Sequence, residues 1–294
     1  MNKMKTRFFA FAALALTLAA CNNDNENLND GPVAAQFIAD IMPATRVNSE
    51  GTDWTDGDRI GVTGAGFTNV PYKRENGKFV TDGTTIYFND TETHTFNAYY
   101  PYQSDGGTVT VSTAADKQGA DIDFLFASGA TGDKNSPVVS FTDKTDKGGA
   151  DNSFHHRMSR ITLTFEAGDG VDFSMIKPER YTLDGLILTG TFNTADGIAT
   201  ADDGAQTGEL TMELADGNLT SSVILFPQTA ASLPLTVNYR SQNYHATLTV
   251  PEGALQAGNN YTYTVKVRNK GLEVSEATIA KWNDVDGGEV GADL

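Results

Sequence analysis

Short runs of alternating apolar and polar residues, separated by clusters of Gly, Asn and Asp, are the feature that most constrains the fold of this chain. An alternation with a period of two places every second side chain on one face of a β-strand. No segment keeps a helical period over ten or more residues. The runs follow one another at about the spacing expected for a β-sandwich or barrel. The sequence therefore predicts an all-β protein.

The expected strands fall into two groups, and the last strand of the first group lies within a stretch rich in Gly, Asp, Lys, Ser and Thr. They are Val33–Ile41, Ile60–Val62, Lys78–Val80, Thr85–Phe88, Thr93–Tyr99, Thr108–Val111, Asp123–Phe126 and Val138–Phe141, then Ile161–Phe165, Tyr181–Leu188, Glu209–Leu214, Ser222–Phe226, Leu235–Tyr239, Tyr244–Val250, Asn260–Val267 and Thr278–Trp282. At roughly 100–150 residues per domain, this length favours two domains. The polar stretch Thr131–Asn152 is the expected seam, which gives domains at 33–152 and 153–294.

The N-terminus has the form of a secretory signal. Basic residues come first, then the short apolar run Phe8–Leu18, then Leu18-Ala19-Ala20-Cys21. The run is too short to span a bilayer, which takes about 20 apolar residues. The final four residues resemble a bacterial lipobox, which predicts a signal peptide at 1–20 and acylation of Cys21 by palmitate-type lipid. The alternative is an ordinary cleaved signal beside an incidental cysteine.

Charge and cysteine content narrow the classes of function. Removal of residues 1–20 leaves 18 basic and 38 acidic residues, and such a chain repels phosphate backbones, so we expect no nucleic-acid partner. Residues 21–32 are mostly Asn, Asp and Glu, which predicts a flexible acidic tether after the lipid. Cys21 is the only cysteine, so the exported fold contains no internal disulfide.

The first expected strand precedes a candidate processing site. Its alternating apolar residues predict one buried face and are Val33, Ala35, Phe37, Ala39 and Ile41. Arg46 and Val47 follow within turn-forming sequence, and an exposed arginine in flexible chain is a natural cut site for an Arg-specific protease. The alternative is that Arg46 is merely a surface charge. A second, shorter alternation ends the chain at Val290, Ala292 and Leu294.

No catalytic constellation stands out, and we expect no enzyme activity, no cofactor and no metal. The sequence has no nucleophile elbow and no phosphate-binding glycine loop. An enzyme that uses catalytic carboxylates on a β-scaffold leaves no short sequence motif, so this class of enzyme remains an open alternative. His155 and His156 are adjacent on an expected strand, so their side chains point to opposite faces and cannot share one ion without a bend. The cluster Tyr99–Tyr102 could stack on a sugar, or it could be core or edge packing.

Several stretches together resemble one family. They are Leu18–Cys21, Thr45-Arg46, Trp54–Val62, Phe154–Ile161 with His156, Met158 and Ser159, Leu255–Tyr263, and Ile279 with Trp282. In this order and spacing the chain resembles the fimbrillins of Bacteroidales, the Mfa-like and FimA-like lipoproteins that build type V pili.

The resemblance implies a fold and a route of assembly. The fold is two β-sandwich domains of transthyretin-like topology in tandem. The chain would reach the cell surface as an outer membrane lipoprotein and be cut by an Arg-specific protease between Arg46 and Val47. Loss of the Val33–Ile41 strand would open an apolar groove for a strand of the next subunit, to which Val290, Ala292 and Leu294 could contribute. The partners would be other fimbrillin subunits of a fimbrium, in which the chain is a stalk or tip subunit that supports adhesion.

Two other functions compete with a pilus subunit. One is a non-polymerising surface lipoprotein or tip adhesin that binds host protein or glycan, and the other is an enzyme that acts on extracellular glycans. A protein that stays monomeric after cleavage would favour the first alternative.

Overall fold

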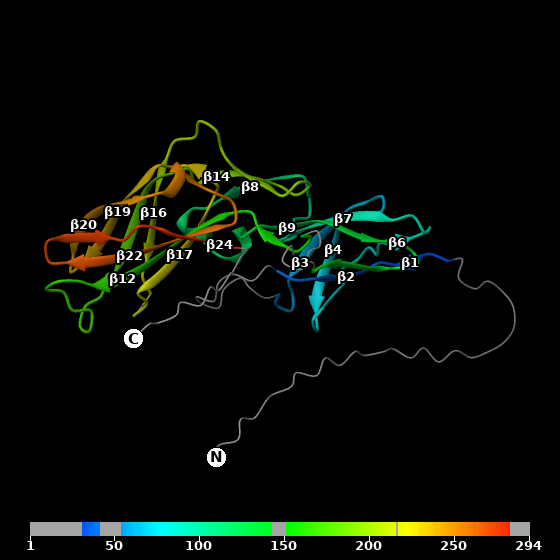
Figure 1. Ribbon diagram of the computed structural model, residues 1–294, viewed down its shortest axis with the longest axis horizontal. Coiled ribbons are helices and arrows are strands. Elements are labelled where there is room, and N and C mark those ends of the chain that lie inside the picture. Colours follow the sequence, from blue (N-terminus) through cyan, green and yellow to red (C-terminus); the bar gives the residue numbers. More distant parts are fainter. Residues whose placement is uncertain (1–30, 42–53, 143–150, 216, 283–294) are drawn as a thin grey trace, which may run out of the picture. The chain divides into compact units, whose positions relative to one another are not determined.

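The structure is a computed structural model that describes residues 31–41, 54–142, 151–215 and 217–282 (Figure 1). Within these ranges the only helices are 3-10 turns, at Ala115–Lys117, Ala120–Ile122 and Pro251–Gly253. None of the described helices is long and apolar enough to cross a membrane. The all-β prediction is therefore confirmed, with several sheets consistent with two β-sandwich domains.

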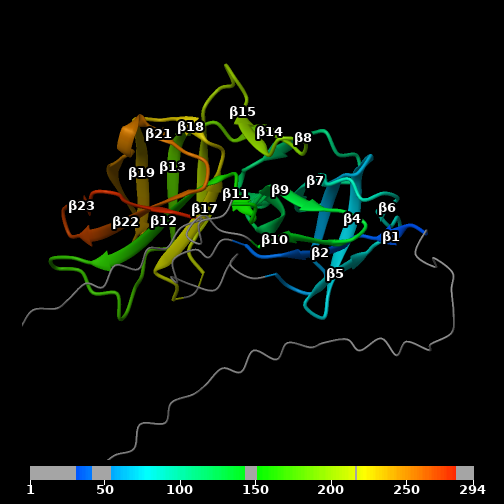
Figure 2. The ribbon, with the colours of Figure 1, turned by 45° about the vertical axis from the view of Figure 1, so that its right-hand side comes forward.

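Eleven strands precede residue 157 in the described part of the chain. They are β1 (Val33–Ala34), β2 (Gln36–Ala39), β3 (Arg59–Gly64), β4 (Phe67–Glu75), β5 (Lys78–Thr81), β6 (Tyr87–Phe88), β7 (His94–Tyr100), β8 (Thr108–Ser112), β9 (Leu125–Gly132), β10 (Val138–Phe141) and β11 (His155–His156). Eight of them form one sheet in the order β10-β2-β5-β4-β3-β7-β9-β11, and β1 pairs with β6 (Figure 2). The alternating apolar residues of these strands, such as Ile60 and Val62 in β3, pack together in one core.

The remaining strands follow residue 158. They are β12 (Ser159–Ala167), β13 (Arg180–Leu186), β14 (Thr189–Asn193), β15 (Ile198–Ala201), β16 (Gly208–Glu213), β17 (Thr220–Leu225), β18 (Gln228–Thr229), β19 (Ser232–Tyr239), β20 (Gln242–Thr249), β21 (Ala254–Leu255), β22 (Asn259–Arg268), β23 (Gly271–Val274) and β24 (Thr278–Lys281). Two sheets, β17-β12-β22-β23 and β16-β13-β19-β20, contribute to a single second core, as expected for a sandwich.

Strands β19 and β20 form a hairpin. Its turn is tight, and Arg240 and Ser241 both adopt positive φ, 53° and 60°. Two such residues make the kind of turn whose twist matches that of the flanking strands. The pairing therefore runs without a break from Ser232↔Thr249 to Tyr239↔Gln242.

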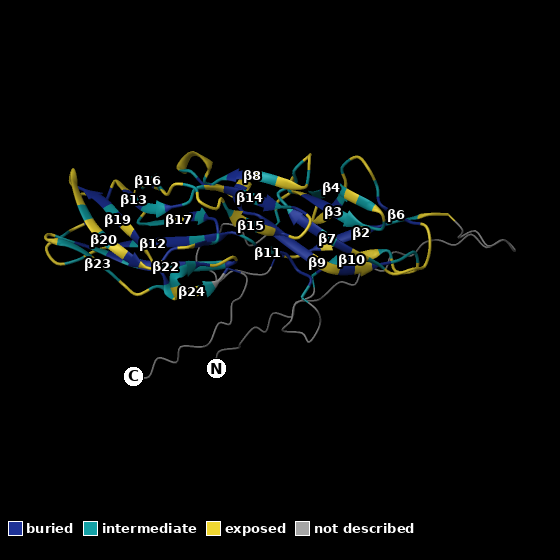
Figure 3. Ribbon diagram, turned by 90° about the horizontal axis from the view of Figure 1, so that it is seen from above, coloured by how far each residue is buried: buried dark blue, intermediate teal, exposed yellow. Residues whose placement is uncertain are grey.

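The two cores are joined by a pairing that the sequence did not predict. Strand β8, from the first half, pairs with β14, from the second half, over five residues, and β15 completes this three-stranded sheet (Figures 1 and 2). A third apolar cluster lies at the same junction and includes Tyr99, Phe124, Phe192 and Trp282. Figure 3 shows buried positions continuing along the strands of both halves.

The chain passes from the first core to the second between His156 and Ser159. Phe154 belongs to the first core and β11 pairs with β9, whereas Ile161 in β12 belongs to the second core. One expected strand was misplaced: β9 starts at Leu125 rather than at Asp123 and runs on to Gly132. Asp123 instead ends a 3-10 turn, and its carboxylate bonds to His156.

Candidate functional site

The candidate site is the first described segment, β1 and β2, seated in the first sheet. Strand β2 runs parallel to β10, from Gln36↔Val138 to Ala39↔Phe141, and these pairs are extended at each end by backbone hydrogen bonds. Gln36 N donates to Pro137 O at 2.9 Å and Asp40 N donates to Phe141 O at 3.1 Å. On the other edge, among the described residues, β2 meets β5 at the single pair Phe37↔Phe79. The strand is therefore bonded firmly on one side and weakly on the other.

The side chains of this segment alternate as the sequence predicts. Ala35, Phe37, Ala39 and Ile41 are buried, whereas Gln36, Ile38 and Asp40 face outward and Val33 is half-buried. The Phe37 ring is 2% exposed and lies edge-on to Tyr72 at 4.5 Å and to Phe96 at 5.6 Å. A phenylalanine buried to this extent contributes about 1.5–3 kcal/mol relative to exposure. Phe37 is the main apolar anchor of the segment.

Withdrawal of this segment would leave a defined groove. The strands β10 and β5 would each lose a partner, and the rings of Tyr72, Phe96 and Phe141 would lose contact with Phe37. Unpaired strand edges beside an apolar stripe favour addition of another strand. Burial raises the pKa of the Tyr72 hydroxyl, which accepts a hydrogen bond from Ile86 N beside this groove.

The chain on either side of residues 42–53 is held at one buried ring. Ile41 forms a parallel bridge with Phe154, and Phe154 N donates to Asp40 O at 3.1 Å. Trp54 resumes the chain edge-on to the same Phe154 ring, with 5.0 Å between centroids. Phe154 is fully buried. Trp54 therefore anchors the chain that begins at residue 54 to the first core.

The other predicted site residues lie outside the described residues. These are the lipidation residue Cys21, the processing residues Arg46 and Val47, and the C-terminal residues Val290, Ala292 and Leu294. Their predicted roles stay predictions.

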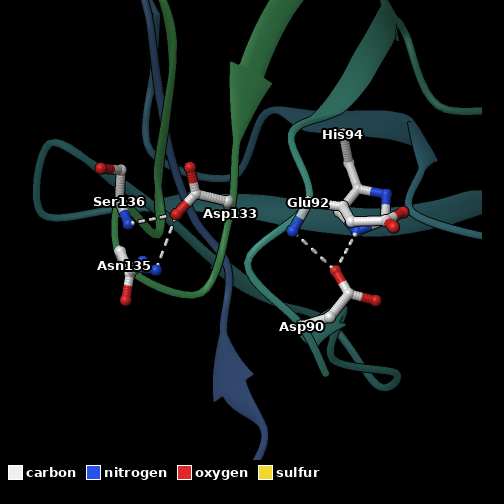
Figure 4. A network of polar contacts seen from close by, with 6 residues as sticks. All are labelled: Asp90, Glu92, His94, Asp133, Asn135 and Ser136. Atoms are coloured by element: carbon white, nitrogen blue, oxygen red, sulfur yellow. Dashed lines mark hydrogen bonds and ion pairs between the residues drawn. The ribbon is translucent and has the colours of Figure 1, made fainter.

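Two tight turns fix the start of β10, against which β2 pairs (Figure 4). Asp133 Oδ1 accepts hydrogen bonds from Asn135 N at 2.7 Å and Ser136 N at 2.9 Å, just before Pro137. In the neighbouring loop, Asp90 Oδ1 accepts from Glu92 N at 3.0 Å and lies 3.2 Å from His94 Nε2. Lys134 N donates to Asp90 O and joins the loops. These carboxylates accept hydrogen bonds from backbone N–H groups of the turns. The turns thereby align the edge of β10 with which β2 pairs.

The paired histidines bond to different carboxylates, in keeping with the prediction that they point to opposite faces. His155 Nε2 lies 2.8 Å from Asp151, and His156 Nδ1 lies 2.7 Å from Asp123. Within the described residues, no group of three His, Cys, Asp or Glu side chains is placed to hold a metal ion.

Asp151, Ser153 and His155 have the composition of a catalytic triad but not its geometry. Asp151 accepts from the Ser153 hydroxyl at 2.7 Å, while the same His155 nitrogen that meets Asp151 is 3.5 Å from Ser153. In a working triad the histidine accepts the serine proton and the aspartate bonds to its other nitrogen. Burial alone would raise the pKa of Asp151, but hydrogen bonds from His155 and Ser153 hold it below its usual range. The trio ties down the crossing segment.

Trp282 lies beside a pocket of about 520 Å³ at the junction of the halves. The His156 ring stacks on the indole at 4.0 Å, and the Arg160 guanidinium lies 4.6 Å from the indole ring. Trp282 is only 2% exposed, so the indole offers no open face to a sugar, and its role here is packing.

The cluster Tyr99–Tyr102 is also engaged in packing. Tyr99 is buried and donates to Asn69 Oδ1 at 2.7 Å, and burial raises its pKa to about 12. Tyr100 lies edge-on to Trp54, and the Arg59 guanidinium covers Tyr102 at 4.8 Å. This arrangement favours the core and edge reading of the cluster over sugar stacking.

Comparisons with known proteins agree on one group. The profile of a family described as Fimbrillin-like matches residues 45–282. The candidate fimbrium subunit Fim1C of Bacteroides uniformis is 28% identical, over 97% of this chain and 98% of its own. The crystal structure of a candidate cell adhesion protein from Bacteroides ovatus is 28% identical with a TM-score of 0.72, over 87% of this chain and all of that one. One from Bacteroides uniformis is 26% identical with a TM-score of 0.68, over 86% of this chain and all of that one.

Proposed function

Since the chain belongs to the fimbrillin-like family, we propose that it is a pilus subunit in which the segment formed by β1 and β2 is a removable plug. It is a fimbrial structural protein of the type V pilus family of Bacteroidales and not an enzyme. The observation that carries the proposal is the seating of β2, with Phe37 buried among Tyr72, Phe96 and Phe141 but only one residue pair to β5 in the described part.

The route to the mature subunit completes the proposal. The precursor is exported by residues 1–20 and held at the outer membrane by lipid on Cys21, with 21–32 as tether. An Arg-specific protease cuts between Arg46 and Val47, and β1 and β2 leave with the tether. A strand of the next subunit, with Val290, Ala292 and Leu294 from its C-terminus, fills the groove. The proposed domains, at 33–152 and 153–294, have transthyretin-like topology; the two cores separate a few residues after this boundary, between His156 and Ser159.

The central test is cleavage of the purified precursor with an Arg-specific protease. We expect a cut after Arg46 followed by SDS-resistant ladders, and we expect an Arg46→Ala variant to fold but to stay uncut and monomeric. Clipped protein that remains monomeric by light scattering would contradict a stalk role. That result would favour a non-polymerising surface lipoprotein or a tip adhesin for host protein or glycan.

A peptide competition tests the groove itself. A synthetic peptide of residues 32–41, added in excess to freshly clipped protein, should occupy the groove and suppress ladder formation. The same peptide with Phe37→Asp is the matched control, because a buried carboxylate facing Tyr72 and Phe96 is strongly disfavoured. Equal inhibition by both peptides would show that assembly does not pass through this groove.

Lipidation has a separate test. Labelling of expressing cells with a palmitate analogue should mark the precursor, and Cys21→Ser should abolish the label. Retention of the label in that variant would contradict Cys21 as the anchor.

A further inference from the structure

The arginines of the described chain share an unusual placement. Seven of the nine arginines in the sequence are described, and each lies in a strand, beside one or in a two-residue turn. They are Arg59, Arg74, Arg157, Arg160, Arg180, Arg240 and Arg268. By contrast, the loop from Gly168 to Glu179 contains no arginine, although Met175 within it is 86% exposed.

Two of these arginines have strands on both sides. Arg160 pairs with Ile224 of β17 and Asn260 of β22. Arg180 pairs with Glu213 of β16 and Asn238 of β19. A protease binds its substrate as an extended segment through backbone hydrogen bonds, as in other cases of strand addition. Cleavage at either residue requires both neighbouring strands to separate first.

Four others are bonded through the backbone as well. Arg59 pairs with Lys73, and its carbonyl accepts from Tyr102 N at 2.9 Å. Arg74 pairs with Phe79 and donates its N–H to Asp58 O at 2.7 Å. For the remaining two, Arg157 N donates to O of Phe124, the residue before β9, at 2.8 Å, and Arg268 pairs with Gly271 of β23.

The side chains add a second restraint. Five guanidinium groups lie 4.6–5.3 Å from the centroid of an aromatic ring. The pairs are Arg59 with Tyr102, Arg74 with Phe79, Arg157 with Phe126, Arg160 with Trp282 and Arg240 with Tyr239. An Arg-specific protease must take the guanidinium into its own specificity pocket. Each of these side chains must therefore leave its ring before cleavage.

Arg240 is the most demanding case, because it is exposed at a hairpin tip and such tips are preferred cleavage sites. Its φ of 53° and the closing pair Tyr239↔Gln242 hold the backbone in a tight turn rather than an extended one. Extension of the chain at this point means opening β19 from β20, which are joined over eight residue pairs.

We propose that the fold itself withholds all seven described arginines from Arg-specific proteases. This inference rests on the proposed function, in which such a protease matures the precursor. The enzyme then needs no sequence preference beyond arginine, because the β-ladders, turn and ring contacts of the folded body supply the selectivity.

The test compares the native arginines with one placed in a loop. Met175→Arg puts an arginine at an exposed position of the Gly168–Glu179 loop. The full precursor and this variant are treated with an Arg-specific endoprotease under native conditions, and the fragments are mapped by mass spectrometry. We expect cleavage after residue 175 in the variant, and cleavage after each of the seven native arginines at least roughly 100-fold more slowly, since it needs an opened state.

Two results would overturn the inference. One is cleavage after Arg240 or any other of the seven at a rate within tenfold of that at residue 175. The other is a Met175→Arg variant that is not cut there, since placement outside a ladder would then not govern cleavage. A precursor cut only outside the seven positions that stays monomeric would contradict the proposed function and leave this inference standing.

Discussion

Each half of the molecule joins an early strand to a late strand in parallel, and the two pairs differ in how they are held. In the first half β2 and β10 pair over four residues, and in the second half β12 and β22 pair over eight. The far edge of β12 is covered by six pairs with β17, whereas the far edge of β2 has one pair with β5 in the described part. Under the proposed function, similar pairing would serve as a permanent element in one half and as a detachable one in the other.

The buried side chains differ in the same direction. Strand β12 buries the large residues Ile161, Leu163 and Phe165, whereas β2 and its flanks bury Ala35 and Ala39 on either side of Phe37. Small side chains remove less apolar area from water and so contribute less to retention of the strand. The segment containing β2 therefore depends mainly on Phe37, with Ile41 at its end.

The largest expected effect is that of Phe37→Ala in the uncut precursor. Removal of a fully buried ring costs about 3–5 kcal/mol of unfolding free energy. The same substitution should leave the clipped body unchanged once β1 and β2 have been removed, because Phe37 leaves with them. Urea unfolding followed by tryptophan fluorescence, before and after cleavage, measures both values. An equal loss in the clipped, separated body would show that the strand does not leave.

The matched substitution in the permanent pair is Leu163→Ala. Leu163 is fully buried in β12 and pairs with Tyr263, so we expect a loss of about 2–5 kcal/mol. Here the loss should be the same before and after cleavage, because β12 stays in the body. A loss that disappears on cleavage would contradict the assignment of permanent and detachable strands to the two halves.

The sequence predicted which side chains are buried where a strand packs one face against one core. The alternation at Ala35, Phe37, Ala39 and Ile41 predicted the buried face that the structure shows, because burial on one side leaves a period of two. The same alternation could not show that β2 pairs in parallel with β10, about one hundred residues away. Pairing partners depend on tertiary contacts, which periodicity does not encode.

The junction of the halves was the least predictable part. The strands β14 and β15, which have Gly190 and an Asp-Gly turn, were missed there. Within the first sheet β4 was also missed, with Asn69 at a positive φ and Pro71 within it. These are turn residues in most settings. Here β14 is held by β8 from the other half, so its stability comes from a neighbour distant in sequence. The packing of Trp282 against His156 likewise had no local signal.

A smaller effect is expected for Gln118→Ala, which tests whether the two halves unfold together. The Gln118 amide donates to Thr113 O at 2.7 Å and Ile224 O at 3.0 Å, and it accepts from Ile224 N at 2.7 Å. Loss of these bonds at a half-buried site should cost about 1–3 kcal/mol. We expect calorimetry to show one unfolding transition for the parent protein and a broader or split transition for this variant. Gln206→Ala, in an exposed loop, is the control and should change neither the unfolding free energy nor the shape of the calorimetric transition.

A still sharper result would come from Gln118→Glu. This variant keeps the shape of the side chain but removes the donor that faces the Thr113 and Ile224 carbonyls. It should destabilise at least as much as Gln118→Ala at neutral pH. If both variants unfold like the parent protein, the halves are joined by the β8 and β14 pairing and the apolar cluster without Gln118.

The smallest expected effect is at Asp151, where the chain crosses between the halves. Hydrogen bonds from His155 and Ser153 hold the pKa of Asp151 below its usual range against the opposing effect of burial. A lowered pKa in the folded state means that the carboxylate stabilises the fold above the unfolded value, about 3.9, and that this stability is lost as pH falls through the lower folded value. The contribution should stay below about 1 kcal/mol because the group is partly solvated.

Asp151→Asn should therefore lower the unfolding free energy at pH 7 by this small amount, and the difference from the parent should shrink below about pH 4. Asp203→Asn, at an exposed loop position, is the control. Urea titrations between pH 3 and 7 measure both variants. A difference that instead grows as pH falls would mean that the Asp151 carboxylate is not stabilised by these bonds. The crossing segment would then be held by the Phe154 ring and the pairing of β11 with β9, which belong to the first half.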